Sequence, residues 1–192
     1  RTQLDSYPLA PYLDYQQTLR SLNKSKSKQI STFIDKYSDL PIANRLNRTW
    51  LNHLNKQKQW KQYAQHFAAY PVSNTRYECQ QQFALFNGTK KQKKSALYKA
   101  RELWLVGNSQ PKACDPLFKA WMATGRPTSS EAHDRFWLSI AQNNIKLARY
   151  LDKKVTQKKQ KTNSSAFWSL YNKPETFTPK KLNRIPEAHR IV

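Results

Sequence analysis

Glycine is scarce in this sequence. Only three glycines, Gly88, Gly107 and Gly125, occur among its 192 residues. Loops that cradle phosphate groups need several glycines close together, and a turn-dense all-β fold uses glycine at many of its turns. Helices, by contrast, use glycine mainly at their ends. The shortage therefore excludes a glycine-rich phosphate loop and favours an all-α fold.

Long apolar runs are absent as well. No stretch approaches the roughly 18 apolar residues of a membrane span, and residues 1–20 lack the apolar segment of a signal peptide. We expect no membrane span, and we expect that any export signal has already been removed. The two cysteines, Cys79 and Cys114, form either a lone disulfide in an oxidising compartment or two separate thiols in a reducing one.

Acidic residues are few. The 12 Asp and Glu residues stand against 34 Lys and Arg residues, which gives a net charge of +22. A charge of this size concentrates polyanions at the protein surface. The polyanions that fit are nucleic acid, acidic lipid headgroups and carboxylate-bearing cell-wall polymer.

A recurring helix ending is the strongest pattern that is present. Bulky apolar residues precede Gly or Asn at residues 83–88, 103–107, 120–125 and 137–144, so these ends recur every 18 or 19 residues. Gly and Asn tolerate the left-handed conformation that ends many helices. One helix and one turn in this spacing give a two-helix hairpin of about 36 residues, the period of stacked helical repeats. An irregular helical bundle is the alternative.

Other helix signals fit the same organisation. Ile42, Leu46, Trp50 and Leu54 repeat every four positions, and Thr128 with Glu131 has capping-box spacing. The basic run at 153–163 lacks apolar periodicity and is predicted to be a loop. Helices are expected near residues 9–22, 27–38, 42–56, 58–67, 74–87, 92–106, 116–124, 129–142, 144–153 and 164–172.

No acidic residue has the setting of a glycosidic acid. Glycan cleavage needs a carboxylic acid in a sheltered cleft that raises its pKa. Glu131 and Asp134 are expected in a first helical turn, where acids cap backbone donors, and Glu102 is expected to be solvated or paired. The four histidines lack the sequence spacing of a metal site. They are His53, His66, His133 and His189. From the acids and the histidines together, we expect no catalytic residue, metal or cofactor.

Lysines cluster at expected helix starts and loops. These clusters form either a basic rim along one edge of a helical array or an ordinary solvated surface. The clusters are Lys24, Lys26 and Lys28; Lys90, Lys91, Lys93 and Lys94; and Lys153, Lys154, Lys158, Lys159 and Lys161. The six tryptophans stand mostly at core spacing.

The segment LWLVGNSQPKACDPLFKAW, residues 103–121, resembles the superhelical domain of soluble lytic murein transglycosylases. The likeness continues over YPLAPYLDYQQTL at 7–19, over the hairpins at 33–67 and over FWLSIAQNNIKLARYL at 136–151. It therefore covers nearly the whole chain. The family's Glu-Ser, Gly-Leu-Met-Gln and Ala-Tyr-Asn-Ala-Gly motifs, which carry its chemistry, do not occur here.

The resemblance implies a right-handed superhelix, an α-solenoid of stacked antiparallel helical hairpins, forming a single segment over residues 1–192 without a catalytic domain. It also implies a bacterial periplasmic enzyme that cleaves the MurNAc–GlcNAc bond with a 1,6-anhydro product. This chain alone is then expected to be inactive. In such a compartment Cys79 and Cys114 are expected to form a disulfide.

Two functions follow as hypotheses. The first is a scaffold that engages peptidoglycan strands beside the catalytic and linker domains of its parent enzyme. The second is a stand-alone basic helical-repeat module that binds nucleic acid or a protein partner. Under the first, the residues expected to contact polyanions are Lys90, Lys91, Lys93, Lys94, Lys153, Lys154, Lys158 and Lys159.

Overall fold

The computed structural model describes residues 7–176, 178 and 180, and the secondary structure in them is entirely helical. The chain divides into two compact units, residues 1–96 and residues 97–192. The sequence predicted a single segment, and that organisation stays a prediction. None of the described helices is long and apolar enough to cross a membrane.

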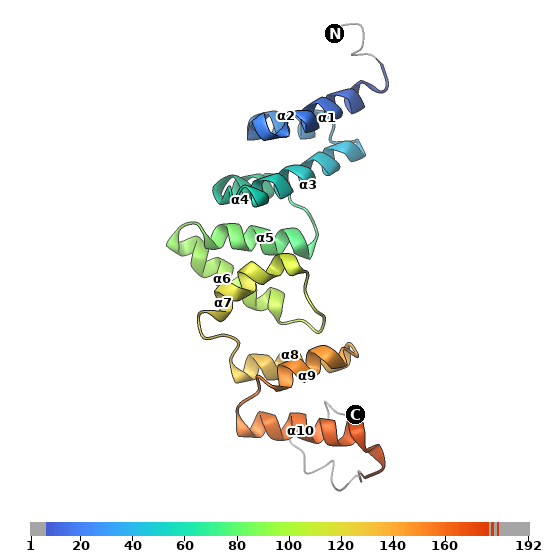
Figure 1. Cartoon of the computed structure of the whole chain (residues 1–192), viewed down its shortest axis with the longest axis vertical. Coiled ribbons are helices and arrows are strands. Elements are labelled where there is room, and N and C mark those ends of the chain that lie inside the picture. The colour runs from blue at the N-terminus through green and yellow to red at the C-terminus, as the bar shows by residue number, and fades with distance from the viewer. Residues whose placement is uncertain (1–6, 177, 179, 181–192) are drawn as a thin grey trace. The chain divides into compact units, whose positions relative to one another are not determined.

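The first unit consists of stacked helices. Helix α3 packs against α1, α2 and α4, and α4 packs against α5, so neighbours along the chain pair as hairpins (Figure 1). The elements are α1 (Ala10–Arg20), η1 (Leu22–Lys24), α2 (Ser27–Lys36), α3 (Pro41–Lys56), α4 (Trp60–Ala69) and α5 (Thr75–Phe86).

Helix α3 forms the middle of this unit for reasons that the sequence makes plain. Pro41 occupies the first helical turn, where its missing N–H costs nothing. The predicted stripe of Ile42, Leu46, Trp50 and Leu54 is buried in the core cluster. The four-residue spacing therefore marks the core-facing side of the helix, as expected.

The second unit contains the shorter hairpins. Helices α8 and α9 form one hairpin, and α10 packs against α8. The elements are the end of α6 (Lys90–Trp104), η2 (Lys112–Cys114), α7 (Asp115–Met122), α8 (Ser129–Ala141), α9 (Ile145–Asp152), α10 (Lys158–Asn172) and η3 (Pro174–Thr176).

The predicted left-handed helix ends are present at two of four places. Gly125 has φ +84° and Asn143 has φ +52°. Gly88 and Gly107 are not among the described residues with positive φ. Gly107 is instead needed for space, because a Cβ there would collide with the backbone carbonyl oxygen of Leu138 in α8.

The predicted loop at 153–163 is partly wrong. Helix α10 begins at Lys158, six residues before the predicted start at 164. The hydroxyl oxygen of Ser129 accepts hydrogen bonds of 2.9 Å from the backbone N–H groups of Thr156 and Gln157, which holds the chain where α10 begins. The prediction failed because the buried residues of this first half are polar, Asn163 and Ser164.

The fold class itself is confirmed. Within each unit the described helices pack as the antiparallel hairpins of an α-solenoid.

Candidate functional site

Among the acidic residues that the structure describes, Glu131 has the most enclosed side chain, with 4% of its surface exposed. It lies in the first turn of α8, where Thr128 caps the helix. The Thr128 hydroxyl accepts from the Glu131 N–H at 3.2 Å, and Glu131 Oε2 accepts from the Thr128 N–H at 2.8 Å. The capping box predicted from the sequence is therefore present.

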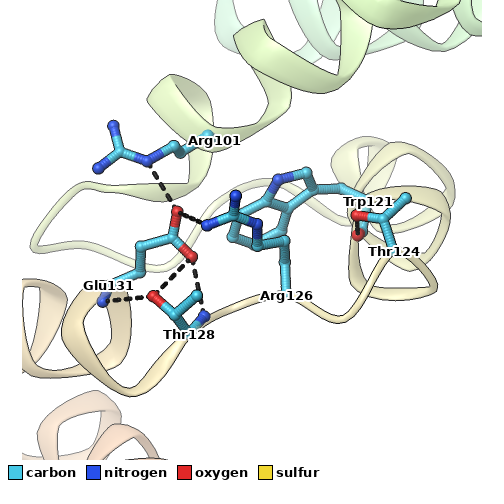
Figure 2. Close-up of polar contacts among 6 residues, drawn as sticks. All are labelled: Arg101, Trp121, Thr124, Arg126, Thr128 and Glu131. Atoms are coloured by element: carbon cyan, nitrogen blue, oxygen red, sulfur yellow. Dashed lines mark hydrogen bonds and ion pairs between the residues drawn. The ribbon is translucent and has the colours of Figure 1, made fainter.

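Two arginines complete the surroundings of this carboxylate. Arg101 Nε and Arg126 Nη1 both donate to Oε1 of Glu131, at 2.8 and 2.9 Å (Figure 2). Arg101 comes from α6 and Arg126 from the turn before α8, so Glu131 joins two segments that precede its own helix. The contact between Arg101 and Glu131 could not be predicted from the sequence, because 30 residues separate them.

The electrostatics of Glu131 oppose a role as a general acid. Burial favours its neutral form, but the Thr128 N–H and the guanidinium groups of Arg101 and Arg126 outweigh burial and hold its pKa below the usual range. A carboxyl that donates a proton to a glycosidic oxygen needs a raised pKa. Glu131 is thus an ionised structural carboxylate.

Glu102 and His66, two further titratable residues that the structure describes, both contact neighbouring side chains. Glu102 accepts from exposed Lys99 at 2.6 Å, and this contact lowers the pKa of Glu102. His66 is buried against Asn47 at 3.0 Å. Among the described residues, no group of three or more His, Cys, Asp or Glu side chains could hold a metal ion. His189 lies outside the described residues.

The predicted lysine cluster at the start of α6 is fully on the surface. Lys90, Lys91, Lys93 and Lys94 are all exposed and occupy the first turns of this helix. Within the part of the chain that the structure describes, none of the four forms an ion pair with an acid, while Lys93 lies 4.7 Å from the ring of Phe86. Positive charge at a helix N-terminus is unfavourable. Helix stability does not account for this arrangement.

The second predicted lysine set spans the connection from α9 to α10. Lys153, Lys158 and Lys159 are exposed, and Lys154 lies 5.1 Å from the ring of Tyr150. Lys161 differs from them, because its ammonium group is 2.8 Å from Asp152. Polyanion contact by these lysines, and by those of α6, stays a prediction.

Most tryptophans belong to the core, as their spacing predicts. Trp50, Trp104, Trp121 and Trp137 are buried, whereas Trp60 and Trp168 are half-buried. Trp60 lines a groove of about 740 Å³ between α4 and α5. This groove could not be predicted from the sequence, because no periodicity marks the polar side chains that line it.

The role of Arg135 could not be predicted from the sequence. It is a buried cation in α8 whose guanidinium donates to the backbone oxygens of Val106 and Asn108, at 3.0 and 3.1 Å, and lies 4.4 Å from the Trp104 ring. Burial lowers its pKa to about 10, so it stays protonated at neutral pH. Arg135 and Gly107 together dock the turn after α6 onto α8.

Both cysteines are fully buried, Cys79 in α5 and Cys114 in η2, and neither is a free thiol.

The chain has well-defined relatives. A soluble lytic murein transglycosylase from Escherichia coli is 32% identical over 173 residues, which are 90% of this chain and 26% of that protein. The protein of the same name from Salmonella typhimurium is 30% identical over 171 residues. No protein-family profile matches the chain. The chain thus spans about a quarter of the length of these curated relatives, 26% in each case.

Solved structures show the same relationship as the sequence comparison. The 70 kDa soluble lytic transglycosylase from Escherichia coli matches with a TM-score of 0.69 and 32% identity, over 91% of this chain and 28% of that one. An inactive mutant of the lytic transglycosylase Slt from Pseudomonas aeruginosa matches with a TM-score of 0.77 and 25% identity, over 100% of this chain and 31% of that one. The resemblance seen in residues 103–121 is confirmed.

Proposed function

We propose that this chain, which is related over 90% of its length to soluble lytic murein transglycosylases, is the helical scaffold of a periplasmic enzyme of that kind and engages peptidoglycan strands. The observation that carries the proposal is the 32% identity maintained over 173 residues, together with the shared fold. The partners in this proposal are peptidoglycan and the catalytic and linker domains of the parent enzyme.

In this proposal, cleavage of the MurNAc–GlcNAc bond belongs to the catalytic domain of the parent enzyme. Glu131, the most buried acid among the described residues, is held ionised by two arginines and a helix cap, so it has no proton to give. We expect this chain to release no 1,6-anhydro products from peptidoglycan when it is assayed alone.

Electrostatic attraction is the proposed means of engagement. Peptide stems of peptidoglycan carry carboxylates, and the exposed lysines of α6 and of the α9–α10 connection supply the opposite charge. Attraction between exposed charges is screened over about 10 Å at 0.1 M salt. Binding should therefore weaken steeply as salt is added.

The test is co-sedimentation of the chain with purified sacculi between low and moderate salt. Replacing Lys90, Lys91, Lys93 and Lys94 by Gln should reduce binding and flatten its salt dependence. The control replaces Lys24, Lys26 and Lys28, exposed lysines at the end of η1 and around the start of α2, and should change binding less per charge removed. Salt-insensitive binding would contradict this mechanism, and tighter binding to duplex or single-stranded nucleic acid than to sacculi would contradict the function.

The proposal includes a disulfide between Cys79 and Cys114, because the chain contains no other cysteine and neither of these is a free thiol. Closing a loop of this length stabilises a domain by roughly 3 to 4 kcal/mol. Peptide mapping without reductant should give one linked pair of peptides. Two free thiols in protein exported to the periplasm would contradict the assignment.

A further inference from the structure

The groove between α4 and α5 is an open trough within the first unit. Its volume is about 740 Å³, which is enough for several side chains of a partner. Its margins are exposed at Ala68 of α4 and at Thr89 and Gln92 beside the start of α6. From Trp60 to Ala68 it follows about two turns of α4, or roughly 12 Å. A segment of a protein can therefore lie along it.

The groove contains an aromatic anchor. Trp60 is half-buried in its lining, together with Leu85 of α5. The indole is held by a T-shaped contact with Phe83, with ring centroids 5.3 Å apart. Tryptophan is among the residues that most often dominate the binding energy of protein interfaces. The partly exposed face of Trp60 is thus available to apolar side chains of a partner.

The two helices that form the walls are fastened to each other directly. The Tyr63 hydroxyl of α4 donates to Oε1 of Gln80 in α5 at 3.1 Å. Gln81 Nε2 of α5 donates to the backbone oxygen of Ala64 in α4 at 3.4 Å. Both contacts exist without a partner, so the groove is preformed. Binding then costs little ordering of the walls.

The walls also determine the conformation of what they bind. Helices α4 and α5 use their backbone N–H and C=O groups for their own hydrogen bonds, so they offer no ladder to an extended strand. A segment in the groove must satisfy its own backbone groups. A helix does this, and over two turns it presents side chains at i, i+4 and i+7 along one face. The groove therefore fits an amphipathic helix.

The charge around the groove sets the charge of this helix. Residues 55–95 contain eight Lys and Arg residues but a single acid, Glu78, which does not line the groove. Lys61 lies exposed in the lining and forms no ion pair with an acid that the structure describes. At the other margin, Lys90 and Lys91 directly follow Thr89. Acidic residues beside an apolar stripe complement both margins, whereas basic residues are repelled.

We propose that the groove between α4 and α5 docks an acidic amphipathic helix of a partner protein. The apolar side chains of that helix pack against Trp60 and Leu85, and its carboxylates approach Lys61. The inference goes beyond the proposed function, because the partner is a protein and not a glycan strand. It gives the scaffold a surface that recruits a second protein.

Stapled helical peptides are the probes. The first carries Leu at i, i+4 and i+7 with Glu on both sides of this stripe. The second has Lys in place of Glu, and the third has Ala in place of Leu. A staple on the opposite face keeps all three helical, since short helices are marginal in water. Each peptide is titrated into the full chain and followed by heteronuclear NMR.

The first peptide should shift the backbone amides of the residues that line the groove at concentrations below about 1 mM. The peptide with Ala in place of Leu should bind at least about tenfold more weakly, because it buries less apolar surface. The peptide with Lys in place of Glu should also bind at least about tenfold more weakly, because the charges then repel.

Two pairs of variants locate the site. Ala68→Trp fills the groove from an exposed position and should abolish binding of the first peptide. Ala69→Trp is its matched control, because Ala69 is the next residue of α4 and is exposed but does not line the groove. Lys61→Glu should weaken the first peptide about twofold to fivefold. Lys28→Glu changes the net charge equally from an exposed position in α2 and should leave the affinity unchanged.

Several results would overturn the inference. The absence of shifts in the groove at about 1 mM of the first peptide would do so, as would equal affinity for the Glu and Lys peptides. Equal effects of Ala68→Trp and Ala69→Trp would place the peptide elsewhere. Muropeptides that shift the same amides more strongly would assign the groove to the wall polymer. Sacculus binding should survive Ala68→Trp, so failure of the peptide experiment leaves the proposed function standing.

Discussion

At the scale of single residues, Glu131 shows how a buried acid serves structure. Its carboxylate accepts from two guanidinium groups and a helix-capping N–H. Thr128 at the N-cap three residues earlier made the cap predictable from sequence. The arginine contacts were not predictable, because they depend on where α6 and the turn at Arg126 lie in the fold.

Replacing Glu131 by Gln should lower the free energy of unfolding by about 1–3 kcal/mol, since the hydrogen bonds from both arginines lose their charged acceptor and an amide NH2 cannot accept from the Thr128 N–H. The value stays modest because both arginines are partly exposed. Urea denaturation at neutral pH measures the change. Glu102→Gln, which breaks an exposed ion pair, serves as the control and should leave stability unchanged. An equal loss of unfolding free energy in both variants would contradict a larger contribution from the buried contacts of Glu131.

His66 should make stability depend on pH. Burial lowers its pKa from 6.5 to about 4, so the unfolded chain binds this proton more tightly than the folded chain. The contribution of His66 to the free energy of unfolding is complete above about pH 6.5, falls as the pH drops, and is lost near pH 4. In total this contribution is up to about 3 kcal/mol.

The measurement is the free energy of unfolding at several pH values from 7 to 4 in the unmodified chain and in His66→Gln. Glutamine can still donate to Asn47 but does not titrate in this range. The variant should therefore show a shallower loss of stability between pH 6.5 and 4. Parallel curves for the two proteins would contradict the assignment to His66.

At the scale of elements, two glycines that follow helices are required for different reasons. Gly125 supplies a left-handed backbone, and a Cβ there would meet no neighbouring heavy atom within 4 Å, while Gly107 lets the backbone of α8 approach closely. Asn tolerates positive φ but adds bulk. Gly125→Asn should thus cost less than about 1 kcal/mol, and Gly107→Asn should cost about 1–3 kcal/mol or more. Thermal unfolding of the two variants decides between the mechanisms, and equal losses would contradict them.

Helix α10 marks where sequence patterns stop being informative at this scale. The buried stripe on α3 could be predicted because its residues are apolar. The buried face of the first half of α10 instead carries Asn163 and Ser164. Ser164 donates to Asp152 at 2.6 Å, and Lys161 pairs with the same acid. These hydrogen bonds replace apolar burial, so a search for hydrophobic periodicity cannot find them. The groove at Gln81 was missed for a related reason, because the burial of that glutamine depends on α4.

At the scale of the whole molecule, the net charge of +22 should make the folded state sensitive to salt. Like charges repel one another most when the chain is compact. Raising salt from low to moderate concentration should therefore stabilise the chain by about 1 kcal/mol, or about 2–4 °C in Tm. Calorimetry tests this, with the variant of Lys90, Lys91, Lys93 and Lys94 to Gln showing a smaller rise. A Tm that falls with salt would contradict the account.

The first turns of α6 have a consequence for the rate of local opening. Four lysines stand at the positive end of the helix dipole, and a single capping pair, Thr89 with Gln92, holds its start. Backbone amides of residues 90–94 should then exchange their hydrogens with solvent sooner than those in the middle of α3. A bound polyanion would neutralise these lysines and slow that exchange, so the protection of a few amides would record occupancy of the surface.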